Sequence, residues 1–329
     1  MRTRTAVAGI GAAIALAPAA PANADDKVVA TVAKPTTVSA ARGHAAWSAW
    51  DPAVNGYRLM HYQRNGDVAQ LRRIAPNPVP FDIDLGKDPF GGAIGVFSRC
   101  ARPPLSTFDL DGRRGCDIYR VRMTTGAGQV KQRNANGPAD EYWPTVWDGR
   151  IAFTRTYKPR GHRNRRYVYW RSFDGNGPSH KLRRGPEDGV PEQLDMRGRN
   201  VTYLWQFEFG AQVRWADTAG GGRALVRIPG SGAAARDLIG QGPTLGGGFV
   251  HWGLASNDPV VSEIRRTDLG TRDQERATTP IPGTSGLATR GFSYDGDIAW
   301  YVKEVDADTF EIHRVTGLKY EPAPPLDID

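Results

Sequence analysis

Short runs of apolar and aromatic residues, each preceded by a glycine turn, recur along the chain at nearly even spacing. The last residues of these runs, used here as markers, are Trp47, Phe97, Phe153, Tyr203, His251 and Trp300. The intervals between markers are 50, 56, 50, 48 and 49 residues. A second run rich in strand-forming residues follows each marker. The pattern predicts six units of about 50 residues, each a meander of three or four antiparallel strands.

The third unit, residues 144–182, is the clearest copy, and it shows no helical period of 3.6 residues. Asp148 and Gly149 form a turn signal before a short apolar strand that ends at Phe153. A polar, basic loop then leads to an aromatic strand at residues 167–170, and a second turn follows at residues 174–177. We therefore interpret the unit as strand, loop, strand, turn, strand.

Six such units predict an all-β fold, a six-bladed β-propeller of antiparallel meander blades. The alternative is a row of β-sandwich domains, each of about 100 residues. Even spacing without linkers argues against it. A propeller must also join its last blade to its first, because open sheet edges favour aggregation. The apolar segment within residues 27–38 is predicted to supply an N-terminal strand that completes the sixth blade.

The first 24 residues have the pattern of a signal peptide. Arg2 and Arg4 precede an apolar run at residues 6–17, and Ala22 and Ala24 form an A-x-A cleavage site. The run is too short for a transmembrane helix, which needs about 17 residues or more. We expect a secreted, extracellular protein with no transmembrane segment, whose propeller domain covers residues 25–329.

The chain has two cysteines, Cys100 and Cys116. An even number in an exported protein predicts a disulfide bond. The bond would join the two ends of a long loop between adjacent strands, and chain entropy gives such a bond about 3 kcal/mol. The loop also accounts for the one long interval between markers.

Motifs that would identify an enzyme are missing from the sequence, which has no G-x-S-x-G, H-E-x-x-H, Walker loop or C-x-x-C. We therefore predict no catalytic residues, no metal site and no cofactor. The six histidines are scattered and are interpreted as core or surface residues; they are His44, His61, His162, His180, His251 and His313.

Three groups of carboxylates are candidates for acid pairing or calcium binding. Asp82 and Asp84 lie two apart on an expected strand, so both face the same side. They could pair in the central channel, but a turn or salt-bridge role is the favoured interpretation. The groups at residues 109–112 and 306–311 lack the full ligand pattern of a calcium loop and are interpreted as solvated turns.

Positive charge is concentrated in the third unit. Residues 155–184 hold ten Lys or Arg and one acid, Asp174, whereas the whole chain has a formal charge of +8. Loops carry function in propellers, and arginine forks suit phosphate and carboxylate groups. The predicted anion-binding residues are Lys158, Arg160, Arg163, Arg165 and Arg166. The alternative is an ordinary solvated loop, since a charge run names no ligand.

The repeat resembles that of TolB-type, WD-like six-bladed propellers. The resemblance rests on residues 144–153, with the spacing Pro-x₃-Asp-Gly-x-Ile-Ala-Phe, and on residues 294–300. Residues 82–86, 96–100 and 116–119 resemble uncharacterised secreted propellers of actinobacteria. The resemblance implies the propeller fold and, from TolB-type proteins, binding to a protein or an envelope component. It supplies no catalytic residues.

Together these observations predict a secreted, monomeric propeller that acts as a binding or scaffold module. Its expected partner is a protein or an anionic envelope component, such as a cell-wall polyphosphate, an acidic glycan or phospholipid headgroups; nucleic acid is not expected. The alternative is a propeller hydrolase or lyase with its site at the central channel.

Overall fold

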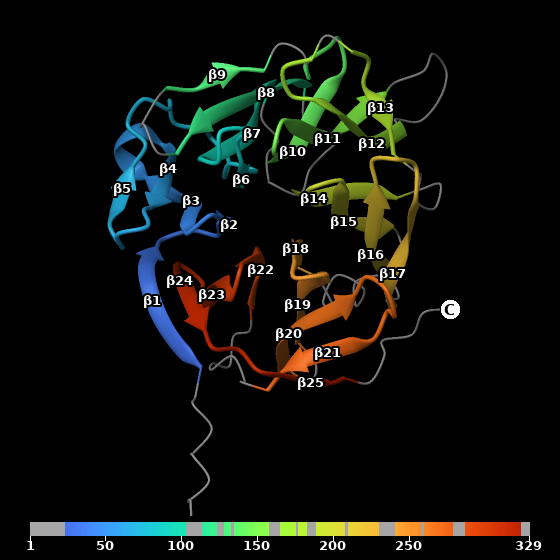
Figure 1. Ribbon diagram of the computed structural model, residues 1–329. Coiled ribbons are helices and arrows are strands. Elements are labelled where there is room, and N and C mark those ends of the chain that lie inside the picture. The colour runs from blue at the N-terminus through green and yellow to red at the C-terminus, as the bar shows by residue number, and fades with distance from the viewer. Residues whose placement is uncertain are drawn as a thin grey trace, which may run out of the picture.

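The structure, a computed structural model, describes residues 24–102, 114–123, 128–132, 135–157, 165–175, 177–182, 189–207, 210–229, 241–257, 260–278 and 287–323. Within this part of the chain, six antiparallel sheets stand in a ring around a central axis (Figure 1). The predicted six-bladed β-propeller is therefore confirmed.

Each blade is one sheet, and the blades are numbered in chain order. The strands of each blade are given from the innermost outward. Blade 1 holds β2 (Val38–Ala41), β3 (His44–Asp51), β4 (Gly56–Tyr62) and β5 (Val68–Gln70), with the short helix η1 (Pro52–Val54). Blade 2 holds β6 (Asp84–Lys87), β7 (Ala93–Arg102), β8 (Arg114–Arg122) and β9 (Val130–Lys131). Blade 3 holds β10 (Asp140–Trp147), β11 (Arg150–Tyr157), β12 (Arg165–Ser172) and β13 (His180–Lys181).

The second half of the ring is built in the same way. Blade 4 holds β14 (Val190–Arg197), β15 (Asn200–Phe207), β16 (Gly210–Asp217) and β17 (Gly222–Pro229). Blade 5 holds β18 (Gln241–Gly246), β19 (Phe249–Asn257), β20 (Val260–Asp268), β21 (Gln274–Ala277) and β25 (Tyr320–Pro322). Blade 6 holds β22 (Leu287–Asp295), β23 (Ile298–Asp306), β24 (Thr309–Thr316) and β1 (Asp25–Val32).

The six sequence markers all lie on the second strand of their blades, and the runs that follow them form the third strands. What the sequence pattern did not identify is the inner strand, which precedes each glycine turn. In blade 3, for example, β10 pairs with β11 on the channel side. Each predicted unit therefore begins at the second strand of its blade and does not include the inner strand of that blade.

The hydrophobic core is divided among the six junctions between blades. Each junction buries one apolar cluster drawn from both neighbouring sheets. Trp47 and Trp300 lie in the cluster between blades 1 and 6 and are almost fully buried. Aromatic side chains bury large apolar areas, so the marker aromatics contribute strongly to holding the ring together.

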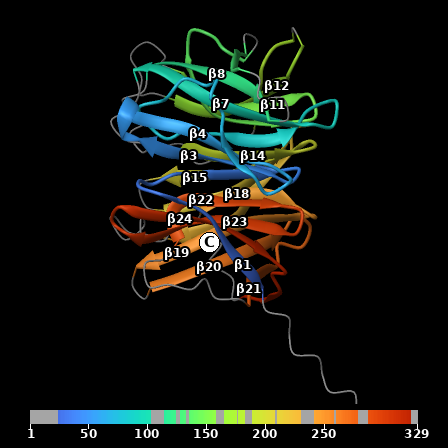
Figure 2. The same ribbon diagram turned by 90° about the vertical axis from the view of Figure 1, so that its left-hand side faces the viewer.

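The ring is closed at blade 6 as the sequence predicted. Strand β1 runs antiparallel to β24, with Asp25 opposite Thr316 and Val32 opposite Phe310 (Figures 1 and 2). The C-terminal segment adds a second closure, because β25 pairs with β21 as a fifth strand of blade 5. The outer edges of two adjacent blades are thus completed by the two ends of the chain.

The predicted disulfide bond is confirmed. Cys100 and Cys116 are bonded and lie directly opposite each other on β7 and β8. The predicted signal peptide, apart from Ala24, lies outside the described residues. Among those that are described, no helix is long and apolar enough to cross a membrane.

Candidate functional site

The six inner strands place one hydroxyl or carboxyl side chain each at the same level of the central channel. These residues, called the channel ring below, are Ser39, Asp84, Thr145, Asp195, Thr244 and Ser293. In five blades the ring residue is in the third pair from the inner hairpin turn, as Ser39 opposite Ala46 shows. In blade 2 a longer loop replaces the two-residue turn, and Asp84 lies opposite Val96.

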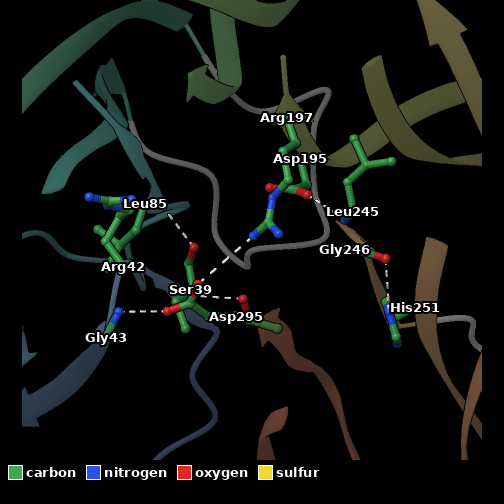
Figure 3. Close-up of polar contacts among 12 residues, drawn as sticks. Ser39, Arg42, Gly43, Leu85, Asp195, Arg197, Leu245, Gly246, His251 and Asp295 are labelled. Carbon is green, nitrogen blue, oxygen red and sulfur yellow. Dashed lines mark hydrogen bonds and ion pairs between the residues drawn. The ribbon is translucent and has the colours of Figure 1, made fainter. Parts of the chain in front are cut away.

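Several ring side chains bond one blade to the next. Ser293 accepts a hydrogen bond from the N–H of Ala40 at 2.8 Å. Ser39 accepts from the N–H of Leu85 at 2.8 Å (Figure 3). In the same way Asp195 accepts from the N–H of Leu245 at 2.6 Å (Figure 3). Three of the six junctions are therefore linked by one shared pattern.

A second level of such bonds lies two residues earlier on the inner strands. One oxygen of Asp82 accepts from the N–H of Trp143 at 2.9 Å, and the Gln193 amide oxygen accepts from the N–H of Gly242 at 2.5 Å. Trp143, Gln193 and Gly242 all have positive φ angles, at a β-bulge next to the ring residue. In a regular strand this backbone N–H would point to a neighbouring strand of its own sheet. The bulge turns it toward the preceding blade.

Asp82 and Asp84 both face the channel, on one side as predicted. The hydrogen bonds that they accept link them to neighbouring strands. Asp82 accepts from the N–H and the hydroxyl of Ser98, at 2.6 and 2.5 Å, and Asp84 accepts from the hydroxyl of Ser39 at 3.0 Å. Their role is to join blades from the channel side.

Two ring carboxylates influence each other across the channel. Burial raises the pKa of Asp195 to about 6. Burial, and then the charge of Asp195, raises the pKa of Asp84 well above its usual value. Because two buried negative charges repel each other, a charge on Asp195 favours the protonated form of Asp84. Raised carboxyl pKa values occur at catalytic sites, so this pair is the strongest observation in favour of an enzyme.

The space beside the ring is small. The cavity there has a volume of about 50 Å³, and all six blades line it. Small-molecule sites usually have roughly 300–1,000 Å³. The channel can therefore hold a few waters at this level but no peptide or sugar unit.

His162 lies outside the described residues, and among the other histidines one pair is in contact. His44 Nδ1 and His61 Nε2 are 2.8 Å apart in blade 1. His251 is buried and stacks on Tyr294, and burial lowers its pKa to about 3. His313 bonds to Asp26 on β1 at 2.8 Å. Among the described residues, no group of three or more His, Cys, Asp or Glu could hold a metal ion.

The predicted anion-binding residues are only partly described. Lys158, Arg160 and Arg163 lie outside the described residues, whereas Arg165 and Arg166 begin β12. Two other cations of the basic stretch have structural partners. Arg155 pairs with the buried Glu141 at 2.8 Å, and Arg171 donates to the carbonyls of Gly175 and Gly177.

The two candidate calcium loops differ in what can be said of them. Residues 109–112 lie outside the described part of the chain. The turn at residues 306–308 is exposed, and Asp306 accepts from the N–H of Asp308 at 3.0 Å. Glu311 bonds to His313 at 3.1 Å. This second group is a solvated turn, as predicted.

No family model matches the sequence, and no curated protein matches it at the threshold applied. Solved structures do resemble the fold. A sialidase from Trypanosoma rangeli aligns with a TM-score of 0.54 and 9% identity over 86% of this chain and 54% of its own. The soluble aldose sugar dehydrogenase from Escherichia coli, in its apo form, gives a TM-score of 0.53 and 10% identity over 89% and 99%. A puromycin-hydrolysing peptidase from Mycobacterium tuberculosis gives 0.50 and 13% over 90% and 55%.

The chain spans about half the length of the peptidase and sialidase chains that it resembles. Identities of 9–13% show a shared fold and nothing about chemistry. The comparisons therefore support the propeller fold alone.

Proposed function

We propose that the protein is a binding module that docks to a phosphate-rich anionic polymer through the positively charged side of blade 3. The proposal rests on how the central channel is filled. Its polar side chains bond neighbouring blades, and only about 50 Å³ remain beside them. A ligand larger than a few waters must therefore bind away from this level of the channel.

Blade 3 is favoured because its outer strands combine cations with aromatic rings. Lys181 Nζ lies 3.2 Å from the centre of the Tyr167 ring, and His180 stacks on Trp170 at 4.9 Å. Lys181 and His180 are exposed, and Arg166 is half-buried on the same sheet. In the sequence, Arg165 and Arg166 follow three further cations, Lys158, Arg160 and Arg163. Such a local excess of one charge attracts a polyanion at long range.

The resemblance to TolB-type propellers stays a prediction, and it points in the same direction, toward binding rather than catalysis. The enzyme alternative depends on the raised pKa values of Asp84 and Asp195. Asp195 accepts from a backbone N–H of the next blade, and Asp84 accepts from the hydroxyl of Ser39 on the preceding blade. A structural role therefore explains why they are there, without a reaction.

A salt series tests the proposal. Binding of the purified protein to long-chain inorganic polyphosphate is measured from about 50 to about 500 mM NaCl, because screening weakens contacts between exposed charges. A parallel series uses phosphatidylglycerol vesicles. We expect affinity for polyphosphate to fall steeply with salt, and to be lost when Arg163, Arg165 and Arg166 are replaced by Ala together.

The matched control replaces Arg72, Arg73 and Lys319 by Ala; all three are exposed and lie outside blade 3. It removes the same charge and should bind almost as the unchanged protein does. Binding that the blade 3 variant retains, or that both variants lose equally, would contradict docking at this blade. Binding to vesicles alone would replace the polymer by a membrane surface as the partner.

A further inference from the structure

A second cavity lies on the face of the ring that carries the inner hairpin turns, between blades 1 and 2. Its volume is about 300 Å³, and its walls include Arg42, His44, Gln63, Arg64 and Gly91. The antiparallel strand order places this face opposite the ends of β11 and β12 at Tyr157 and Arg165. The cavity is therefore separate from both the channel ring and the proposed docking surface.

Two guanidinium groups meet at this cavity. Arg42 Nη2 donates to the carbonyl of Gly91 at 3.0 Å, and Arg64 Nε donates to the carbonyl of Arg42 at 2.7 Å. Each arginine is thus oriented by one bond to the main chain and keeps further N–H groups for a ligand. Within the described part of the chain, neither guanidinium forms a salt bridge.

The backbone of Arg42 has a conformation that is unfavourable for an arginine. Arg42 occupies the first position of the inner hairpin turn with a φ of 60°, and Gly43 follows at 79°. The same turn in blade 3 uses Asp148 and Gly149. A left-handed conformation suits Gly, Asn or Asp and is unfavourable for other residues. Strain of this kind gathers at functional sites.

The histidine pair adds polar groups without adding charge. His44 lines the cavity and stacks on His61, with ring centres 5.0 Å apart. Burial, and then the nearby Arg64, lowers the pKa of His44. Burial, and then His44, lowers the pKa of His61 to about 4. Both rings are therefore neutral at pH 7, and the positive charge of the cavity comes from Arg42 and Arg64.

The acids nearest to the cavity are already engaged. Asp295 accepts from the N–H of Gly43 at 2.6 Å and lies 3.9 Å from Arg197 (Figure 3). Asp88 accepts from the N–H groups of Phe90 and Gly92, each at 2.8 Å. Neither carboxylate is paired with Arg42 or Arg64, so the two guanidinium groups remain available to an incoming anion.

We propose that this cavity binds a small phosphate-bearing molecule, with the phosphoryl group held by Arg42 and Arg64. Arginine forks match the oxygen geometry of phosphate, and charge-assisted bonds of this kind are about twice as strong as neutral ones. The volume lies at the lower end of the usual range for small-molecule sites, roughly 300 Å³, and leaves room for a group attached to the phosphate. The side chain of Phe90, 88% exposed on the adjoining loop, can cover such a group.

Isothermal titration of the purified protein with inorganic phosphate and with a hexose 6-phosphate tests the proposal. The two probes distinguish free phosphate from a phosphomonoester, and we expect the ester to bind more tightly. Arg64→Gln and Arg42→Gly should each weaken binding at least about tenfold, the loss expected for a hydrogen bond to a charged group. Arg42→Gly also relieves the positive φ, so it should fold at least as well as the parent.

Arg72→Gln is the matched control, because Arg72 is exposed, is in the segment that follows blade 1, and is not among the residues that line the cavity. It should leave both affinities unchanged. No heat of binding for either probe at about 10 mM, near the weak end of measurable affinity, would overturn the proposal. Binding that Arg42→Gly and Arg64→Gln both retain would overturn it as well. Neither result depends on whether polyphosphate binds to blade 3.

Discussion

At the scale of single residues, the channel ring shows how short polar side chains hold large sheets together. Ser39 and Asp195 each reach a backbone N–H on the next blade, at 2.8 and 2.6 Å. The partners are 46 and 50 residues away in the chain. Pattern reasoning could place Asp82 and Asp84 on one side of a strand. It could not identify their partners, because sequence spacing does not show which backbone groups meet across a junction.

Replacing Asp195 by Asn should make stability less dependent on pH. Burial raises the pKa of Asp195 from 3.8 to about 6. The folded state therefore keeps a proton that the unfolded state has lost between these values, and the unfolding free energy falls as pH rises through this window. At about 1.4 kcal/mol per pH unit, the fall reaches up to about 3 kcal/mol.

Urea unfolding at pH 4 and pH 7 measures this difference. In Asp195→Asn it should be smaller than in the unchanged protein. Asp297→Asn, at an exposed turn, is the control and should behave as the parent does. An equal fall in Asp195→Asn and the parent would show that Asp195 is ionised normally in the folded state.

Gly86 allows the close approach of blades 2 and 3. A Cβ atom at this position would lie 1.7 Å from the carbonyl oxygen of Val146 on β10. Gly86→Ala must therefore push the two inner strands apart, and we expect a loss of about 1–3 kcal/mol in unfolding free energy. Gly177→Ala is the matched control, because nothing lies within 4 Å of its added methyl group. Equal stability of the two variants in urea would contradict the close contact.

At the scale of elements, regular spacing predicted the second and third strands of every blade. The inner strands escaped because three of them contain a bulge, at Trp143, Gln193 and Gly242, which breaks the alternation of apolar and polar residues. Strand β25 was not predicted from the sequence, for another reason. It is only three residues long and ends in Pro322, so its local sequence does not distinguish it from a tail.

Strand β1 was predicted because its apolar residues had no blade of their own. It pairs with β24, and Asp26 bonds to both Tyr301 and His313. Deleting residues 27–34 should therefore destabilise the whole ring and lower the single melting transition by on the order of 10 °C. Val28→Thr, at a position 44% exposed, should shift it little. An unchanged melting temperature for the deletion would show that the ring does not need this closure.

At the scale of the whole molecule, six markers at intervals near 50 residues were enough to predict the fold, because each blade is one repeat. The site could not be predicted to the same extent. The cavity that holds Arg42 and Arg64 forms only where turns of one blade meet the loop of the next. Charge in blade 3 was visible in the sequence. The structure adds that Arg155 and Arg171 have partners within the fold.

The most direct test of the account compares polyphosphate binding at low salt among three proteins. They are the unchanged chain, the blade 3 variant with Arg163, Arg165 and Arg166 replaced by Ala, and the channel variant Asp84→Asn with Asp195→Asn. We expect the channel variant to bind as the unchanged chain does and the blade 3 variant to lose binding. Loss of binding in the channel variant, with binding retained in the blade 3 variant, would contradict the account and move the site to the central channel.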